Sequence, residues 1–247
     1  MSGMDHPHSG TGLPDGGPEL PVAAAPAAVR AQLLATEHWS LLASRSTTQG
    51  EVLTRISMFL TFTSASLLSA ALVGQATKFS DTFIIFGIVV LFIDLGIGLL
   101  TQIRVMYVGM EDLMYVIAMN RLRAAYVELD PGLARYLMAA SHDDLPGSRK
   151  TYYFFGTRSQ GGHVAGSSMT FIIAVNAALI ALLSGTLLVL PGVPVGLAVP
   201  FAALCGLAFG FVSLLRGYQR YTAAWQGFAP LSPTPPQEQA EGQQAEG

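Results

Sequence analysis

The chain has 247 residues, of which 51% are hydrophobic and 12% are charged, and its net charge is −3. This composition is too apolar for a soluble globular domain and indicates an integral membrane protein, with the lipid bilayer as its main partner. The 13 lysines and arginines are spread along the chain, which argues against a nucleic-acid partner. The single cysteine, Cys205, excludes an internal disulfide and a cysteine-based metal site.

Residues 1–26 are rich in glycine, proline and alanine, and we expect them to form a disordered cytoplasmic tail. His6 and His8 lie in this tail without the further ligands that a metal site needs. The sequence therefore predicts no metal and no other cofactor. Residues 27–56 contain no proline, so we expect a cytoplasmic helix that continues into the membrane.

Four apolar runs are each long enough to cross a bilayer as a helix, which takes about 20 residues. They form two predicted transmembrane hairpins, 57–103 with spans 57–76 and 83–103, and 167–215 with spans 167–190 and 195–215. No short basic segment of the signal-peptide kind stands directly before the first run, so we expect a retained span and not a cleaved signal peptide. The predicted fold class is therefore all-α, a polytopic membrane protein with four transmembrane helices.

Positive charge is distributed unevenly around these spans. Of the 13 lysines and arginines, all but Lys78 lie before the first span, between the second and third, or after the fourth. Lysine and arginine are retained on the cytoplasmic side of a membrane. We therefore expect both termini and the central loop in the cytoplasm, two tight turns outside, and a location in the plasma membrane, as in a bacterial inner membrane.

The region 104–166 is predicted to begin as a helical extension of the second span, because no helix breaker stands at the inner end of that span. Apolar and polar side chains mark one face of this extension at spacings of three and four: Val108, Asp112, Tyr115, Met119, Leu122, Tyr126 and Leu129. Pro131 then ends the helix. The marked face needs a partner, either the helix before the first span in a coiled-coil-like hairpin or another subunit, and both alternatives stay open.

Counting residues predicts a charge contact between the two cytoplasmic helices. Arg45 lies 12 residues before the first span, and Asp112 lies 9 residues after the second. At about 1.5 Å per residue these side chains reach similar heights above the membrane. We predict that Arg45 pairs with Asp112 or with Glu111, and that the pair sets the register of the hairpin.

Asp94 stands at the centre of the second span, where a charge is costly. The same counting places Ser66 and Asn176 at its depth, so Asp94, Asn176 and Ser66 are predicted to form an intramembrane polar cluster. Two interpretations stay open. The acid is either a protonated group that holds the helices together by hydrogen bonds, or a carboxylate on a path for a cation or proton.

Small residues predict where the spans pack closely. Gly87 and Gly98 share the helix face of Asp94, which predicts that this face contacts protein and not lipid. Gly206 and Gly210 form a GxxxG pattern in the fourth span.

The remaining polar motifs have plain explanations. The "SHDD" stretch at 141–144 favours a polar turn, with a metal site through its histidine and aspartates as the weaker alternative. "TYYFF" at 151–155 is typical either of a segment at the membrane interface or of core for the central loop. Residues 216–247 are predicted to form a cytoplasmic tail that is disordered from about residue 229.

Four stretches carry a resemblance to a known family: "EHWSLLASRS", "RISMFLTFTSASL", "MNRLRAAYVELDP" and "SHDD". Over roughly residues 35–215 the chain resembles an uncharacterised bacterial family of four-span integral membrane proteins. That family has no assigned activity, cofactor or substrate, so the resemblance implies the four-span layout and no catalytic residue. A looser likeness of layout, to the small membrane effectors of bacterial defence systems, points towards pore formation.

Two classes of function therefore stay open. One is a non-enzymatic association or scaffold module that binds a protein partner or a second copy through its cytoplasmic helices. The other is an oligomeric pore or ion pathway organised around Asp94. We expect no enzyme, because the spans contain no nucleophile beside a base, no paired carboxylates and no HExxH-like metal motif.

Overall fold

The computed structural model describes residues 25–153 and 167–236, and every regular element in these ranges is a helix. In chain order they are α1 (Ala27–Ala76), α2 (Asp81–Leu129), the 3-10 helix η1 (Pro131–Tyr136), α3 (Leu145–Tyr152), α5 (Ser168–Val189) and α6 (Val195–Gln226). Four of them, α1, α2, α5 and α6, are long and apolar enough to cross a membrane. The prediction of an all-α chain with four candidate spans is confirmed.

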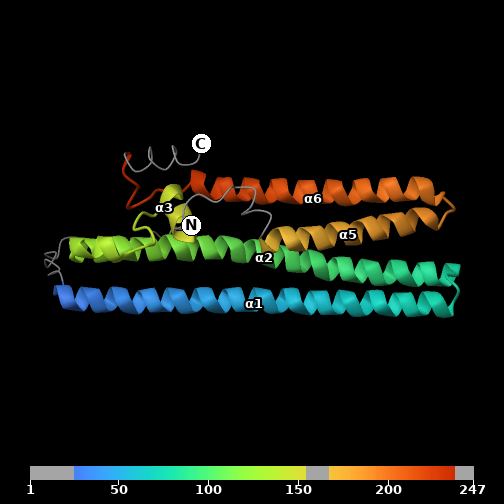
Figure 1. Ribbon diagram of the computed structural model, residues 1–247, viewed down its shortest axis with the longest axis horizontal. Helices are drawn as coiled ribbons and strands as arrows, with labels where there is room; N and C mark the ends of the chain where they lie inside the picture. Colours follow the sequence, from blue (N-terminus) through green and yellow to red (C-terminus); the bar gives the residue numbers. More distant parts are fainter. Residues whose placement is uncertain (1–24, 154–166, 237–247) are drawn as a thin grey trace, which may run out of the picture.

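The four long helices lie side by side in the order α1, α2, α5 and α6 (Figure 1). α1 packs against α2, α2 against α5, and α5 against α6. Each helix runs antiparallel to the next (Figure 1). Because α1 and α2 have 50 and 49 residues and α5 has only 22, the first two helices continue well past the start of α5.

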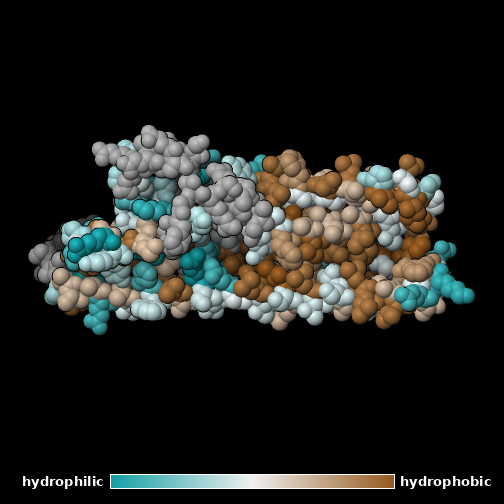
Figure 2. Space-filling model, viewed as in Figure 1, coloured by the Kyte–Doolittle hydropathy of each residue, from teal (hydrophilic) through white to brown (hydrophobic). Residues whose placement is uncertain are grey.

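The molecule divides into an apolar half and a polar half (Figure 2). We use apolar half for residues 56–103 and 167–215, and polar half for residues 27–55, 104–153 and 216–236. From Asp81 to Arg104 the apolar part of α2 rises about 35 Å, close to the hydrocarbon thickness of a bilayer.

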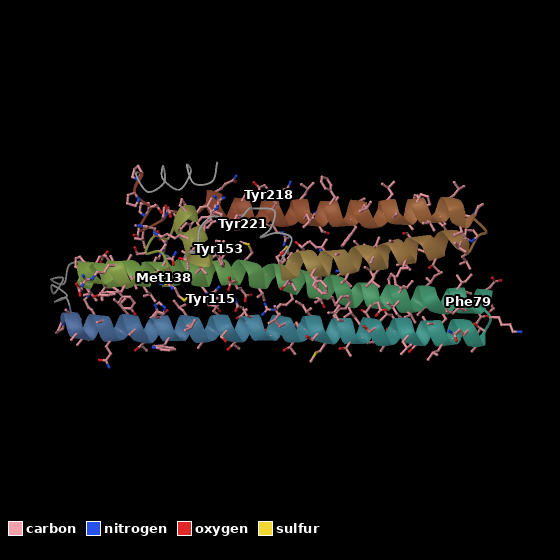
Figure 3. All side chains as sticks on the ribbon, viewed as in Figure 1. Phe79, Tyr115, Met138, Tyr153, Tyr218 and Tyr221 are labelled. Carbon is pink, nitrogen blue, oxygen red and sulfur yellow. The ribbon has the colours of Figure 1, made fainter. Side chains whose placement is uncertain are left out.

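Aromatic side chains mark the two ends of the apolar half. Phe79 lies at the far turn, whereas Tyr153, Tyr218 and Tyr221 lie near the start of α5, at the junction with the polar half (Figure 3). Tyrosines gather in this way at the interfaces between membrane and water.

Local chemistry explains where the long helices end. α2 stops at Asp130, whose side chain accepts a hydrogen bond of 2.9 Å from the Gly132 amide just after Pro131. Between α1 and α2 the turn passes through Lys78 and Phe79, both with positive φ. The Phe79 ring lies over Gly74, where any Cβ would approach that ring to 2.7 Å. The missing side chain at Gly74 therefore lets the turn close.

The hydrophobic core lies where α1, α2 and α5 meet, around the junction of the two halves. Its buried members are Val52, Ile56 and Phe59 of α1, Leu91, Val105 and Val108 of α2, and Ile172 and Leu179 of α5. α6 is attached at the edge of this group and buries only small residues, Ala198, Ala202 and Gly206. Many large apolar side chains of the apolar half face outward, as in a protein whose solvent is lipid.

The structure changes one predicted boundary. Residues 229–236, which we predicted to be disordered, are described and pack against the loop before α3. The predicted tail segments 1–24 and 237–247 and the part of the central loop at 154–166 lie outside the described residues.

Candidate functional site

Buried polar side chains mark the places where a function can reside, because each needs a specific partner. Within the described residues they are Thr63, Asp94, Thr101, Asn120, Asp143, Ser148, Asn176 and Thr234. With partly buried charges added, there are three polar groups: buried side chains in the apolar half, partly buried side chains between α1 and α2 in the polar half, and buried side chains around the loop before α3.

Asn176 joins α5 to α2 inside the apolar half. Its Nδ2 donates to the backbone carbonyl of Gly98 at 3.0 Å and to Oε1 of Gln102 at 2.8 Å. Gly98 permits this contact, since a Cβ there would overlap Oδ1 of Asn176 and lie 2.9 Å from the Phe59 ring. An intramembrane amide and a glycine thus hold the two helices in one register.

Asp94 is fully buried on α2 and faces α1. The hydroxyl groups of Thr63 and Ser66 lie close enough to act on its carboxyl group, yet neither carboxyl oxygen makes a well-formed hydrogen bond within the described residues. Asn176, which we predicted to share a cluster with Asp94 and Ser66, bonds to Gly98 and Gln102 instead. Because Gly98 has no side chain, its backbone carbonyl is open to the Asn176 amide.

The glycines predicted at helix contacts fall into two classes. A Cβ at Gly206 would lie 2.6 Å from the Ala177 carbonyl, and one at Gly210 would lie 3.9 Å from the Ala177 Cβ, so the GxxxG face packs against α5. Gly98 contacts α5 as described above. Gly87 differs from the prediction, because no other helix among the described residues comes within 4 Å of its Cβ position.

In the polar half, Asp112 joins α1, α2 and α3. Arg45 donates to both of its carboxylate oxygens, with Nε–Oδ1 at 2.6 Å and Nη2–Oδ2 at 3.2 Å. Gln49 donates to Oδ1 at 2.8 Å, and the Tyr152 hydroxyl donates to Oδ2 at 2.7 Å. The predicted contact between Arg45 and Asp112 is therefore present, and α3 adds a donor that the sequence pattern did not indicate.

These bonds shift the acid-base properties of the three groups. Burial by itself raises the pKa of Asp112, but the hydrogen bonds from Arg45 and Tyr152 outweigh burial and hold that pKa below its ordinary value. The hydrogen bond to Asp112 raises the pKa of Arg45. Burial and the neighbouring carboxylate raise the pKa of Tyr152. At neutral pH the cluster is an ion pair with a neutral phenol, which suits it to hold helices together.

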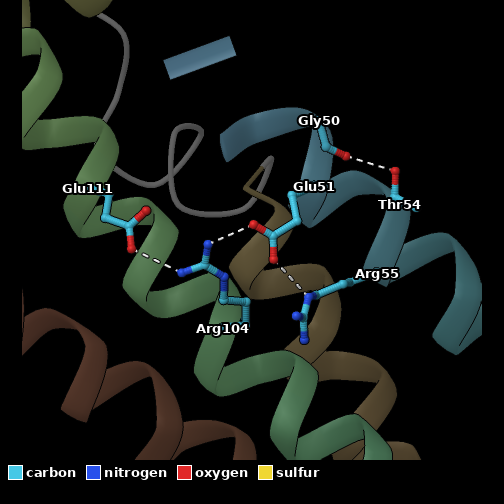
Figure 4. Close-up of polar contacts among 6 residues, drawn as sticks. All are labelled: Gly50, Glu51, Thr54, Arg55, Arg104 and Glu111. Atoms are coloured by element: carbon cyan, nitrogen blue, oxygen red, sulfur yellow. Dashed lines mark hydrogen bonds and ion pairs between the residues drawn. The ribbon is translucent and has the colours of Figure 1, made fainter. Parts of the chain in front are cut away.

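A second charge network lies nearer the apolar half (Figure 4). Arg104 of α2 donates to Glu51 of α1 at 2.9 Å and to Glu111 at 3.0 Å, and Arg55 donates to Glu51 at 3.0 Å. Glu111, our alternative partner for Arg45, therefore pairs with Arg104. Glu111 and Asp112 are consecutive residues of α2 and point in directions about 100° apart, so each meets a different arginine.

The third group surrounds Asp143 in the "SHDD" stretch. Its fully buried carboxylate accepts from the backbone amides of Leu231 at 2.9 Å and Ser232 at 2.8 Å, and from Nε of Arg121 at 2.6 Å. The Asp143 amide in turn donates to the Ser232 carbonyl at 3.1 Å. The stretch is more than a polar turn, since it holds the C-terminal segment. The described residues contain no group of three metal-binding side chains.

Asn120, which the sequence pattern did not single out, fastens this loop to α2. It is fully buried, and its Nδ2 donates to the His142 carbonyl at 2.8 Å. Its Oδ1 accepts from Arg123 at 2.6 Å and from the Thr151 hydroxyl at 2.9 Å. An amide inside an otherwise apolar helix face was the signal available in the sequence.

No family model, curated protein or solved structure matches the chain. The family resemblance therefore stays a prediction, and function rests on the chemistry of these contacts.

Proposed function

We propose that this protein is a non-enzymatic association module of the plasma membrane, which presents the polar half of α1 and α2 in the cytoplasm to a protein partner or a second copy. The length of this helical pair is the observation that carries the proposal. From Arg104 to Leu129 the polar part of α2 rises about 38 Å, and α1 lies antiparallel to it.

The polar contacts support a stiff pair of helices. The carboxylate of Asp112 receives bonds from α1 and α3, and Arg104 ties α2 to Glu51 of α1. Exposed ion pairs stabilise little on their own, but two networks at different heights define one register. A surface held in one register is suited to binding, because little freedom is lost when a partner docks.

The outer surface of α1 offers apolar side chains for such a partner. Trp39 and Leu33 are 72% and 63% exposed in the polar half, where water rather than lipid is the expected solvent. Exposed large apolar groups outside the membrane are typical of interaction surfaces. The charge distribution supports a cytoplasmic location for the polar half, since Lys78 alone among the lysines and arginines lies at the far turns.

Photo-crosslinking in native membranes tests this proposal. A photoreactive phenylalanine at position 39 is expected to give a protein adduct, whereas the same residue at Leu207, 72% exposed in the apolar half, is expected to react with lipid. A doubled mass identifies a second copy. The adduct should weaken in Arg45→Met, which breaks the bond to Asp112. A chain that gives no protein adduct at position 39 or at Leu33 contradicts the proposal.

A second candidate function rests on Asp94, whose buried carboxyl oxygens lack well-formed hydrogen bonds within the described residues. A buried acid is costly in a membrane, and such acids often mark a path for a proton or cation. Because Asp94 has no exposed surface in one chain, this path requires a rearrangement or several copies. Proton flux in liposomes should then be abolished by Asp94→Asn and unchanged by Asp81→Asn. Equal flux in both variants rejects this function.

A further inference from the structure

The C-terminal segment matches the loop before α3 in its pattern of hydrogen-bond donors. Between positions 231 and 235 only Leu231, Ser232 and Thr234 have an amide N–H, because the other two residues are prolines. Asp143 accepts from the first two amides, and Asp144 accepts from the third at 2.7 Å. Every backbone donor of this stretch is therefore bound by one of two neighbouring carboxylates.

A side chain adds to this recognition. The Thr234 hydroxyl donates to Oδ1 of Asp144 at 2.7 Å, and Thr234 is 7% exposed. Arg121 balances the charge of Asp143 and also stacks its guanidinium over the Phe228 ring, 5.2 Å from the ring centre. Burial raises the pKa of Asp143, but the bonds from the Leu231 amide and Arg121 outweigh burial and hold that pKa below its ordinary value. The acceptor is thus a carboxylate at neutral pH.

The rest of the chain holds the two acceptors in place. Asp144 caps α3 by accepting from the Gly147 amide at 2.9 Å. Gly147 is required there, because a Cβ would overlap the His142 carbonyl. That carbonyl is held in turn by Asn120 of α2. None of these bonds involves the C-terminal segment, so α2 and α3 support the loop through contacts of their own.

We propose that Asp143 and Asp144 form a peptide-binding site, and that its ligand is an extended segment with the order donor, donor, proline, threonine, proline. The chain's own residues 231–235 fill the site and tie the end of α6 to the polar part of α2. This peptide site does not depend on the exposed surface of α1. The peptide-binding proposal and the proposed association function can therefore fail independently of each other.

The test uses the full-length chain in detergent with its own segment disabled. Ser232→Pro removes an amide donor, and Thr234→Glu places a carboxylate against Asp144. A fluorescent peptide with the wild-type sequence of residues 228–236 is added, and its polarisation is measured. We expect the peptide to bind this double variant at least tenfold more tightly than it binds the wild type, whose site is filled. Adding Asp143→Asn to the double variant should remove that binding.

Two results overturn the proposal. In the first, hydrogen exchange shows that the amide of Leu231 is released in the double variant, but the peptide does not bind. In the second, the amide of Leu231 is already unprotected in the wild type and exchanges as fast as in the double variant, so the carboxylates do not hold the segment. The single variant Ser232→Pro is tested with the same peptide, so that binding is also measured in a chain that carries only one substitution. A peptide with valine in place of Thr234 should bind more weakly than the wild-type peptide.

Discussion

The two halves of this molecule hold their helices together by different means. In the apolar half, α5 meets α2 at Gly98 and α6 at Gly206, where missing side chains let backbones approach. In the polar half, carboxylates, guanidinium groups and amides bridge α1, α2, α3 and the C-terminal segment. Lipid offers no hydrophobic drive for helix association, so close packing replaces it. In water, burial drives contact and polar bonds choose among the possible registers.

Two buried asparagines provide the sharpest test of this difference. Asn120 and Asn176 are both fully buried, and each donates Nδ2 to a backbone carbonyl, one in the polar half and one in the apolar half. We expect Asn120→Ala to lower the free energy of unfolding by about 2–3 kcal/mol, because it leaves buried groups around the loop unpaired. Asn176→Ala should cost about 1 kcal/mol, since an unfolded helix in lipid finds other partners. Thermal unfolding in detergent measures both, and a larger cost for Asn176 would reverse the comparison.

A matched pair of glycines tests close packing in the apolar half. Gly98→Ala places a methyl group on the Asn176 amide and should destabilise by about 1–3 kcal/mol through overpacking. Gly87→Ala enters open space on the same helix and should be neutral or slightly stabilising, because alanine favours a helix. The readout is again thermal unfolding. If both variants unfold at the same temperature, glycine at 98 is not a packing residue.

The ion pair of the polar half should have a smaller effect. A double-mutant cycle with Arg45→Met and Asp112→Asn should give a coupling energy of about 1 kcal/mol, because the pair is partly buried and doubly bonded. Pairing Arg45→Met with Glu111→Gln serves as the control and should give no coupling, since Glu111 bonds to Arg104. Coupling to Glu111 instead would place the hairpin in another register.

The same pair predicts a direction of pH dependence. The pKa of Asp112 is lower in the folded chain than in the unfolded chain, so this carboxylate stabilises the fold above its unfolded pKa of about 4. That contribution is lost as the pH falls through the lower folded pKa. Unfolding of wild type and Asp112→Asn between pH 7 and pH 3 should therefore converge on the acid side. A difference that grows with acid would contradict the pairing.

The smallest effect is expected for Glu51, whose side chain is 43% exposed at the edge of the second network. Glu51→Gln should leave thermal unfolding within experimental error at physiological salt, since screening weakens exposed pairs. A clear loss of stability that persists in 1 M salt would show that this network contributes more than register.

Local composition and the rise of a helix were sufficient to predict much of this protein from sequence. Long apolar runs set the four candidate spans, and Pro131 ends α2 where its ring disfavours helix. The height of Arg45 relative to Asp112 also follows from counting, because both helices leave the same turn at about 1.5 Å per residue. Each of these features depends on residues that are close in the chain.

Only the tertiary structure decided which groups of equal height meet. Counting by depth grouped Asn176 with Asp94, but the amide bonds to Gly98 and Gln102, and Gly87 stays free of close contacts. Depth along a helix is a property of the sequence, whereas rotation about the axis and the distance between helices depend on how all of them pack. For the same reason a segment that looked unfit to pack by composition found its donors matched by Asp143 and Asp144, about ninety residues away in the chain.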